Sequence, residues 1–198
     1  GAESSVLYLS DASEVSFQVA SPSAGICVNA ALAIIAAREL GVRDAEIRAR
    51  IEAWRPSSTR GRIAQQGAQT FYIDCYNANP ASMTDALAAF RRAMSSDQPR
   101  CYVLGAMNEL GPAAVELHRD IGRQLQLRPG DRAIFVGPDA LAGAYYAGAL
   151  EAGVDAAQLQ VVADVEKIKS IVADFAGALF LKGSRAYALE KLLPREWL

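Results

Sequence analysis

Hydrophobic and polar positions change their spacing near residue 55 and divide the chain into two blocks. The first block opens with two short apolar segments, SVLYLSD (5–11) and EVSFQVA (14–20), which are typical of strands. A helix is expected next, because apolar residues recur at helical spacing until Gly41, a favourable helix end. Its apolar positions are Val28, Leu32, Ile35 and Ala36. Asp44 can cap a second helix. The apolar positions of that helix are Ile47, Ile51 and Trp54.

The second block alternates short apolar strands with helices of roughly ten to fifteen residues. Strands are expected at 62–65, 69–73, 101–104, 133–136, 160–162 and 178–181. Helices are expected to begin near Pro80, Pro112, Pro138, Val165 and Arg185. This alternation predicts an α/β fold with a Rossmann-like, mainly parallel sheet and helices on both faces. The stretch RPSSTRG (55–61) has the composition of a linker, so we expect a small α+β part at 1–55 and the α/β domain at 56–198.

The composition excludes several classes of protein. The formal net charge is −2 over 198 residues, which argues against non-specific binding to nucleic acid. No apolar run approaches the roughly 18 residues of a membrane span. The opening GAESS lacks the basic region of a secretory signal, so we expect a cytoplasmic protein. The leading Gly1 is typical of a residue left after tag removal, and we expect the chain to be part of a longer protein.

The cysteines do not indicate a metal site. Cys27, Cys75 and Cys101 form no CxxC pair, and His118 is the single histidine of the sequence. We therefore expect no zinc site and three reduced, mostly buried cysteines.

Small or polar residues directly follow four of the predicted strands. These segments are DCYNANP, GAMNELGP, GPD and KGSR. The carboxyl ends of parallel strands form the ligand-binding edge of open α/β sheets, where helix N-termini favour anions. Asp74 at such a strand end can accept hydrogen bonds from a ribose or hold a cation. The alternative for Asn79 is turn chemistry, because it can cap a helix that starts at Pro80.

Several of these stretches resemble the C-terminal domain of the Mur ligases. The resemblance is carried by IDCYNANPASMTDAL, VLGAMNELG and FLKGSRAYALEKLL. VNAALAIIAARELGV resembles the helix at the end of the family's ATP-binding central domain, so the resemblance extends from Val28 to the end of the chain. The YNANP motif favours the branch that adds D-alanyl-D-alanine to a UDP-MurNAc-peptide.

The resemblance implies an ATP-dependent carboxylate–amine ligase of peptidoglycan precursor synthesis that works through an acyl phosphate. ATP with Mg²⁺ would be held mainly by the central domain. The phosphate loop of that domain, of the GxxGKT type, does not occur in this sequence, and LKGSR lacks its glycine-rich run. Residues 1–55 would then be the tail of the central domain and 56–198 the C-terminal domain. The chain alone is expected to be inactive, and the full-length protein to be a monomer.

The resemblance also implies roles for individual residues, none of them catalytic. Arg62 would contact the ATP phosphates and Asp74 the ribose hydroxyls. The expected nucleotide contacts are Arg62, Asp74, Tyr76 and Asn77. The expected substrate contacts are Asn79, Asn108, His118, Lys182, Ser184 and Arg185. The last three of these would form the mouth that accepts the dipeptide carboxylate.

Plainer interpretations remain open for some of these residues. Arg62 would then be a solvated strand residue, Lys182 a surface lysine at a strand end, and His118 a hydrogen-bonded histidine at a helix edge. We expect the Asp74 carboxylate to be solvated without ligand, so that losing it changes stability by under ~1 kcal/mol.

Two other functions stay open. One is a Rossmann-like binding or regulatory module without catalysis, which Ala106 would fit, because the family usually has aspartate at that position. The family's usual histidine near Gly25 is also replaced. The other is a related ligase of the folylpolyglutamate type. A dinucleotide enzyme is disfavoured, because no GxGxxG follows any strand.

Overall fold

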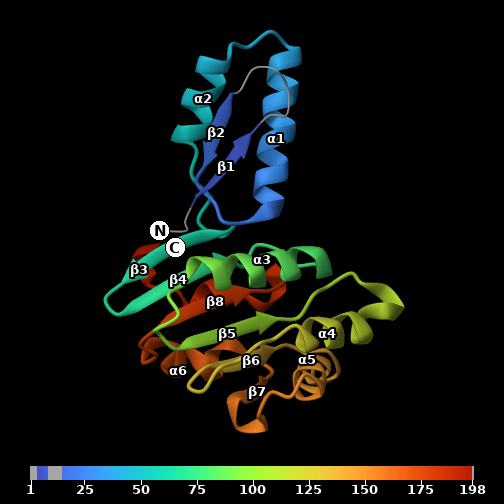
Figure 1. Ribbon diagram of the computed structural model, residues 1–198. Helices are drawn as coiled ribbons and strands as arrows, with labels where there is room; N and C mark the ends of the chain where they lie inside the picture. The colour runs from blue at the N-terminus through green and yellow to red at the C-terminus, as the bar shows by residue number, and fades with distance from the viewer. Residues whose placement is uncertain (1–3, 9–14, 198) are drawn as a thin grey trace.

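The computed structural model describes residues 4–8 and 15–197, and its described part opens with a small N-terminal unit. Strands β1 (Ser5–Tyr8) and β2 (Ser16–Val19) pair antiparallel, and helices α1 (Ala24–Glu39) and α2 (Asp44–Ala53) pack against them (Figure 1). Residues 9–11 of the first predicted strand segment and residue 14 of the second lie outside the described residues.

Six strands form the main sheet in the order β3-β4-β8-β5-β6-β7. Their bounds are β3 Arg62–Gln66, β4 Gln69–Asp74, β5 Arg100–Gly105, β6 Arg132–Val136, β7 Leu159–Val162 and β8 Ala178–Lys182. The edge strand β3 is antiparallel to β4, and all other pairs are parallel. The predicted α/β fold with a mainly parallel sheet is therefore confirmed.

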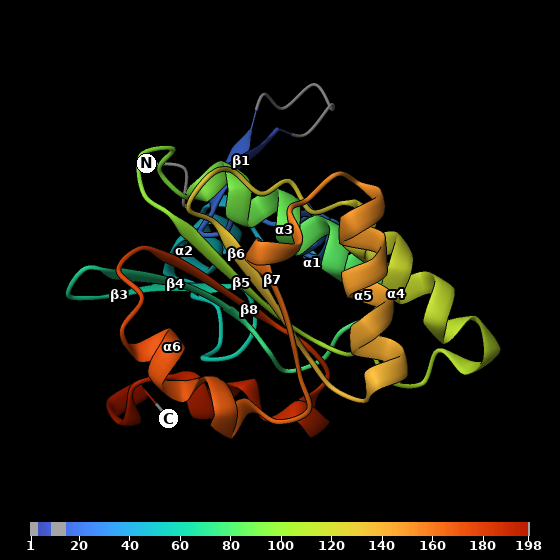
Figure 2. The ribbon, with the colours of Figure 1, turned by 90° about the horizontal axis from the view of Figure 1, so that it is seen from below.

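Helices cover both faces of this sheet (Figure 2). One face carries α3 (Pro80–Ala93), α4 (Ala114–Arg123) and α5 (Asp139–Glu151). The other face carries α6 (Lys169–Ala173) and the turns that follow β8. Because side chains alternate across a strand, Tyr72 packs on the α3 face while Phe71 and Ile73 pack on the α6 face.

Three of the expected helices differ in form. Pro112 lies in the 3₁₀ turn Gly111–Ala113, which precedes α4. The 3₁₀ turn Val165–Ile168 likewise precedes a short α6. The expectation of an α-helix that begins at Arg185 is wrong. The chain there forms the 3₁₀ turns Arg185–Tyr187 and Leu189–Leu192, because Ala188 between them has a left-handed φ of 49° and breaks helical hydrogen bonding.

The apolar stripe of α1 does not face the core of the described chain. Val28, Leu32 and Ile35 are 59%, 61% and 50% exposed, whereas Ile34 on the other side of the helix is fully buried. The spacing correctly predicted a helix, but the helix is apolar on more than one side. A helix with this property usually packs on more than one neighbour. No helix of the described residues is long and apolar enough to cross a membrane.

Helix α3 joins the N-terminal unit to the sheet. Its Asp85 carboxylate accepts hydrogen bonds from the Ser23 hydroxyl (2.6 Å) and from the backbone N–H groups of Ala24 and Gly25 (2.9 and 3.2 Å). Two turns further along α3, the Arg92 guanidinium donates to the Pro22 carbonyl (2.8 Å). The N-terminus of α1 is thus capped by a residue of the other part. A division into separate domains at residue 55 stays a prediction.

Candidate functional site

A cleft of about 900 Å³ lies between the N-terminal unit and the carboxyl ends of β4 and β8. It collects residues from both parts, including Gly25 and Asn29 of α1 and Trp54 after α2. Five of the residues that the sequence assigned to a site line it, namely Asp74, Tyr76, Asn77, Asn79 and Lys182. The expected ligand edge of the sheet therefore coincides with a cleft.

Asp74 and Lys182 form an ion pair at the centre of this edge. The two residues are register partners at the ends of β4 and β8, and Lys182 Nζ lies 2.5 Å from Asp74 Oδ2. The same ammonium group donates to the Asn77 carbonyl at 3.2 Å. Lys182 is only 1% exposed, so the interpretation as a surface lysine is wrong.

This pair also corrects the expectation for Asp74. Its side chain is 21% exposed, and its Oδ2 binds a buried ammonium group instead of water. A buried cation that loses its counter-ion is strongly destabilising, since neither water nor another charge replaces the interaction. The ion pair therefore favours a larger stability loss on removing Asp74 than the small effect expected from its place at a strand end.

Asn77 and Asn79 organise the loop between β4 and α3. The Asn77 Oδ1 accepts from the Ala78 N–H at 2.9 Å. Asn79 caps α3, because its Oδ1 accepts from the Ser82 N–H (2.9 Å) and its own N–H donates to the Ser82 hydroxyl (3.1 Å). This reciprocal capping box, followed by Pro80 in the first turn, fixes the helix start. Turn chemistry therefore occupies the Asn79 oxygen, although the residue also borders the cleft.

Two arginine guanidinium groups lie over the aromatic ring of Tyr76. The Arg60 Cζ lies 3.8 Å from the ring centroid, and the Arg185 Cζ lies 5.6 Å from it. Arg60 lines the cleft, whereas Arg185 lies outside the lining and pairs loosely with Glu190 at 3.8 Å. The guanidinium groups place positive charge at the mouth of the cleft.

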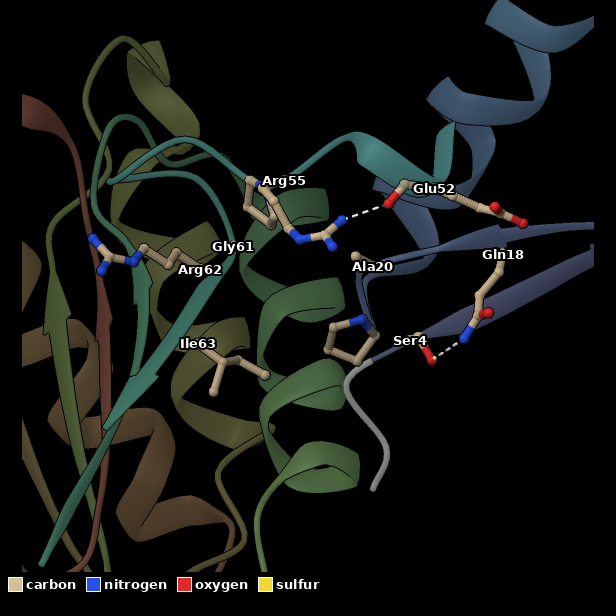
Figure 3. Close-up of a pocket in the computed structure, with 10 residues that line it drawn as sticks. Ser4, Gln18, Ala20, Glu52, Arg55, Gly61, Arg62 and Ile63 are labelled. Atoms are coloured by element: carbon tan, nitrogen blue, oxygen red, sulfur yellow. Dashed lines mark hydrogen bonds between the residues drawn. The ribbon is translucent and has the colours of Figure 1, made fainter. Parts of the chain in front are cut away.

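Arg62 does not join the other predicted nucleotide contacts. Its guanidinium turns away from Arg55 and Gln18 across a smaller pocket of about 580 Å³ (Figure 3). The Arg62 Cζ lies 5.4 Å from the ring centroid of Trp197, which packs on the α6 face of the sheet. Arg62 is the register partner of Ile73, and both point to that face. In this structure Arg62 therefore lies on the opposite face of the sheet from the other expected nucleotide contacts, and its contact with the ATP phosphates stays a prediction.

A second group of predicted residues lies beside the cleft, at the ends of β5 and β8. The Asn108 N–H donates to the Ser184 hydroxyl at 2.9 Å, and the Tyr187 hydroxyl donates to Asn108 Oδ1 at 3.1 Å. The Ser184 N–H donates to the Ala106 carbonyl at 3.1 Å. Ser184 is buried and Asn108 is exposed, so this network holds the two loops together and leaves Asn108 open to a ligand.

His118 is a structural residue and not a substrate contact. It has no exposed surface, and its ring packs on Tyr145 with centroids 4.6 Å apart. Its Nδ1 lies 2.6 Å from the Ala114 carbonyl, and its Nε2 accepts from the Met107 N–H at 2.8 Å. Burial lowers the pKa of His118, partly offset by the bond to Ala114. The neutral ring thus pins the loop after β5 onto α4, and the predicted substrate contact is wrong.

The cysteines supply no nucleophile to the cleft. Cys75 and Cys101 are buried, and Cys27 is half-buried. Burial raises the pKa of Cys75 to about 12, with Glu190 and Asp74 adding to the shift, and burial raises the pKa of Cys101 to about 12 as well. Both thiols therefore stay protonated at neutral pH.

The carboxylates that line the cleft are already engaged. Asp74 binds Lys182, and Asp85 accepts from Ser23 and two backbone N–H groups. Among the described residues, no group of three or more His, Cys, Asp or Glu side chains could hold a metal ion. The carboxylates of the cleft therefore do not fit Mg²⁺. The cationic groups of the cleft suit a phosphate or carboxylate ligand.

Some residues of the cleft could not be singled out in the sequence. The linker RPSSTRGR offers Arg55, Arg60 and Arg62 within eight positions, and charge alone does not separate them. Arg55 and Arg60 line the large cleft, and Arg62 does not. Gly61, which lies between Arg60 and Arg62, has a φ of 66° and forms a turn. Composition alone does not show on which side of the sheet the two arginines lie after this turn. Asp85 was missed because its partners are about 60 residues away.

Comparison with known families identifies the family to which this domain belongs. The family model described as "Mur ligase, glutamate ligase domain" matches residues 60–185, more than half of the chain. The chain belongs to the Mur ligase family. The matched region contains the main sheet and the strand-end segments around Asp74, Asn108 and Lys182, so the family match and the cleft concern the same part of the Mur ligase domain.

Similar proteins include ligases of the same family. UDP-N-acetylmuramoyl-tripeptide–D-alanyl-D-alanine ligase of Treponema pallidum (strain Nichols) is 36% identical over 175 residues, which cover 83% of this chain and 35% of that protein. MurF from Acinetobacter baumannii has a similar structure, with a TM-score of 0.80, 24% identity and coverage of 96% of this chain and 42% of that one. MurF from Thermotoga maritima in complex with ADP has a TM-score of 0.74, 20% identity and coverage of 96% and 42%. The chain therefore spans less than half the length of these relatives.

Proposed function

We propose that this chain is the C-terminal part of an ATP-dependent ligase that adds D-alanyl-D-alanine to a UDP-MurNAc-peptide in peptidoglycan precursor synthesis. The observation that supports the proposal most directly is the strand-end cleft, in which Asp74, Tyr76 and Lys182 lie within the region that matches the family model. The relative from T. pallidum, whose name states this reaction, supports the choice of amine substrate. A cytoplasmic location and a monomeric full-length protein belong to the same proposal.

In the proposed reaction, a substrate carboxylate takes the γ-phosphoryl group of ATP, which gives an acyl phosphate and releases ADP. The amine of the dipeptide attacks the carbonyl carbon, the amide bond forms, and phosphate leaves. The cleft between the two parts of the chain excludes water while the acyl phosphate exists, which prevents hydrolysis. Bound Mg²⁺ would supply charge neutralisation at the phosphates, and we assign its binding to residues outside this chain.

The residues of the cleft divide the proposed tasks. The Asp74 oxygen that does not bind Lys182 accepts from a ribose hydroxyl, and Tyr76 and Asn77 border the nucleotide. Lys182 was expected to contact the dipeptide carboxylate. We propose instead that it acts through Asp74 as a positioning residue, because its ammonium group is buried and already bonded.

The loops beside the cleft receive the second substrate. Asn108, Ser184 and Arg185 contact the dipeptide, and Asn79 lies at the seam between the two ligands. The exposed Arg185 guanidinium suits the dipeptide carboxylate, since a planar fork can pair with two oxygens.

The experiment is a phosphate-release assay on the full-length protein that contains this chain. Release is expected only when ATP, UDP-MurNAc-tripeptide and D-alanyl-D-alanine are all present. Release that requires a folate and glutamate would instead support a folylpolyglutamate-type ligase. Absence of release with any substrate set would support a non-catalytic module, which the alanine at position 106 fits.

A second measurement concerns the 198-residue chain by itself. We expect no micromolar binding of ATP with magnesium in calorimetry, because the sequence lacks the phosphate loop whose N–H groups and lysine supply most phosphate contacts in such enzymes. Micromolar binding would place the main nucleotide site inside this chain.

A further inference from the structure

A buried histidine holds the loop that follows β5, residues 106–110, which we call the Asn108 loop. His118 on α4 has no exposed surface, and its Nε2 accepts from the Met107 N–H at 2.8 Å. Its Nδ1 lies 2.6 Å from the Ala114 carbonyl, so this nitrogen carries the ring proton and donates. A single neutral tautomer thus satisfies both bonds. The ring is a fixed acceptor for the backbone of the Asn108 loop.

A second residue binds the next backbone N–H of the Asn108 loop. The Asn108 N–H donates to the buried Ser184 hydroxyl at 2.9 Å, and Asn108 Oδ1 accepts from the Tyr187 hydroxyl at 3.1 Å. His118 and Ser184 therefore fix two consecutive peptide groups from two different elements. The exposed side-chain nitrogen of Asn108 donates to none of the described residues. This donor is left to bind an oxygen atom of a ligand.

Both loops that meet at Asn108 contain a residue in an unfavourable backbone conformation. Glu109, directly after Asn108, has a φ of 64°, and Ala188, in the loop after β8, has a φ of 49°. A residue with a Cβ enters this left-handed region at a cost in free energy, so it stays there only where other contacts determine the path of the chain. The bond from His118 is such a contact for the Asn108 loop. Without this bond we expect the loop to relax and Asn108 to move.

We propose that His118 is a positioning residue for the dipeptide substrate, because it holds the Asn108 amide where the ligand binds. This inference rests on the proposed function, which assigns Asn108 and Arg185 to the dipeptide. An amide nitrogen and a guanidinium both donate hydrogen bonds, and both suit the carboxylate and carbonyl oxygens of a dipeptide. A donor that is already held in place loses less entropy on binding than a donor on a mobile loop. His118 itself is buried and acts only through the loop.

The nucleotide should not depend on His118. The lining of the large cleft, which contains Asp74 and Lys182, contains neither His118 nor any residue of the Asn108 loop. The loop instead meets the end of β8 through Ser184, on the side assigned to the dipeptide. A loss at His118 should therefore weaken the dipeptide and leave nucleotide affinity unchanged.

The test is calorimetric titration of D-alanyl-D-alanine into the full-length protein that contains this chain, saturated with ADP and UDP-MurNAc-tripeptide. Three variants separate the ring from its nitrogen atoms. His118→Phe keeps a ring against Tyr145 and loses both hydrogen bonds. His118→Asn can keep only the bond to the nearby Ala114 carbonyl. His118→Gln, whose side chain is one methylene longer, can keep an acceptor for the Met107 N–H.

Dipeptide binding is expected to weaken roughly 3- to 10-fold in His118→Phe and His118→Asn, the effect of one neutral hydrogen bond. His118→Gln should stay within about twofold of wild type, and so should ADP binding, measured separately, in all three variants. Hydrogen exchange without ligand should speed up at residues 106–110 in His118→Phe and His118→Asn only. Ile134→Val, a core variant on the α6 face, is the control for a general loss of stability and should bind the dipeptide like wild type.

Equal weakening by His118→Gln and His118→Asn would overturn the inference, because the bond to Met107 would then not matter. Unchanged dipeptide binding by His118→Phe would overturn it too, and so would failure of the wild type to bind the dipeptide. Thermal melts identify any variant that has lost its fold. If His118→Phe is such a variant, the comparison of His118→Asn with His118→Gln decides.

The inference and the proposed function can fail separately. If dipeptide affinity follows the bond to Met107 while the wild type forms no amide from ATP, the inference stands and the proposed reaction fails. If the wild type forms the amide and no folded His118 variant changes the dipeptide KM, the proposed reaction stands and the inference fails.

Discussion

The sheet and the N-terminal unit bury their apolar residues to very different degrees. On the α3 face of the sheet, the rings of Tyr72, Tyr102 and Phe180 pack against Phe90 of α3 in stacked, T-shaped and tilted pairs. A second apolar cluster fills the α6 face. In the N-terminal unit, the buried cluster consists of Phe17, Ile34 and Ile47. The sheet therefore has a core of its own, whereas the N-terminal unit depends on its contact with α3.

This difference concerns function because the cleft lies between the two regions. The sheet holds Asp74 and Lys182 in register, and we expect the N-terminal unit, with its smaller core, to be the less stable side of the cleft. Motions of ligand-binding regions usually involve the less stable part of a fold. We expect the hydrogen bonds of Asp85 to the start of α1 to restrain any such motion.

The largest expected effect comes from the sheet core. Phe180→Ala should lower the free energy of unfolding by about 3–5 kcal/mol, because it removes a fully buried ring and leaves a cavity. Urea unfolding measures this loss. Ile34→Ala should loosen amide protection only within the N-terminal unit in hydrogen exchange. Equal loss of protection in both regions would show that they unfold as one unit.

The second test concerns the buried ion pair at the sheet edge. Asp74→Ala should lower the free energy of unfolding by about 3–5 kcal/mol, because it leaves the buried Lys182 ammonium unpaired. The double variant Asp74→Ala with Lys182→Met removes both charges and should recover most of this loss. A single variant within ~1 kcal/mol of wild type in urea unfolding would contradict the structural role of the pair.

The third test breaks the contact between the regions. Asp85→Ala should cost about 1–2 kcal/mol, the usual value of a helix N-cap, and Asp85→Asn should cost less because one acceptor remains. Hydrogen exchange should speed up at residues 22–26 and stay unchanged in β5 and β8. The exposed Asp174 provides a matched control, for which Asp174→Ala should change neither region. Faster exchange in the sheet of Asp85→Ala would mean that the contact supports the whole fold.

The smallest effect concerns His118. Its folded pKa is lowered by burial, so the unfolded chain takes up a proton first as the pH falls below the usual value near 6.5. The stability contributed by His118 is therefore complete above about pH 6.5 and is lost as the pH falls toward the folded pKa, by at most about 1.4 kcal/mol per pH unit. His118→Gln keeps a donor and an acceptor but does not titrate. Its free energy of unfolding should fall less than that of wild type between about pH 7 and pH 5. Parallel curves would contradict this assignment.

The fold could be predicted from the sequence because its signals are local. Each of the six expected strands of the sheet lies within one residue of its observed bounds, since short apolar runs between turn residues leave few alternatives. The capping of α3 by Asn79 also uses neighbours in the chain. The turns after Arg185 were misjudged because the left-handed Ala188 has no local signal of the kind that glycine gives.

The site was only partly predictable, because burial and partners arise from distant segments. Lys182 is buried through Asp74, which is 108 positions away in the sequence. His118 lies on the same helix face as its apolar neighbours, but the carbonyl of Ala114 and the N–H of Met107 that fix its ring become visible only in three dimensions. The side chains of Arg60 and Arg62 lie on different sides of the sheet. This difference depends on the turn at Gly61 between them.

We propose that the strand-end cleft binds the ligands of a ligase. Hydrogen–deuterium exchange of the full-length protein, with and without ADP and D-alanyl-D-alanine, tests it most directly. Exchange should slow at residues 74–79 and 182–185 when both ligands are present, and should not change in β7 at the far edge of the sheet. Protection confined to segments outside 74–79 and 182–185, with binding confirmed by calorimetry, would contradict it.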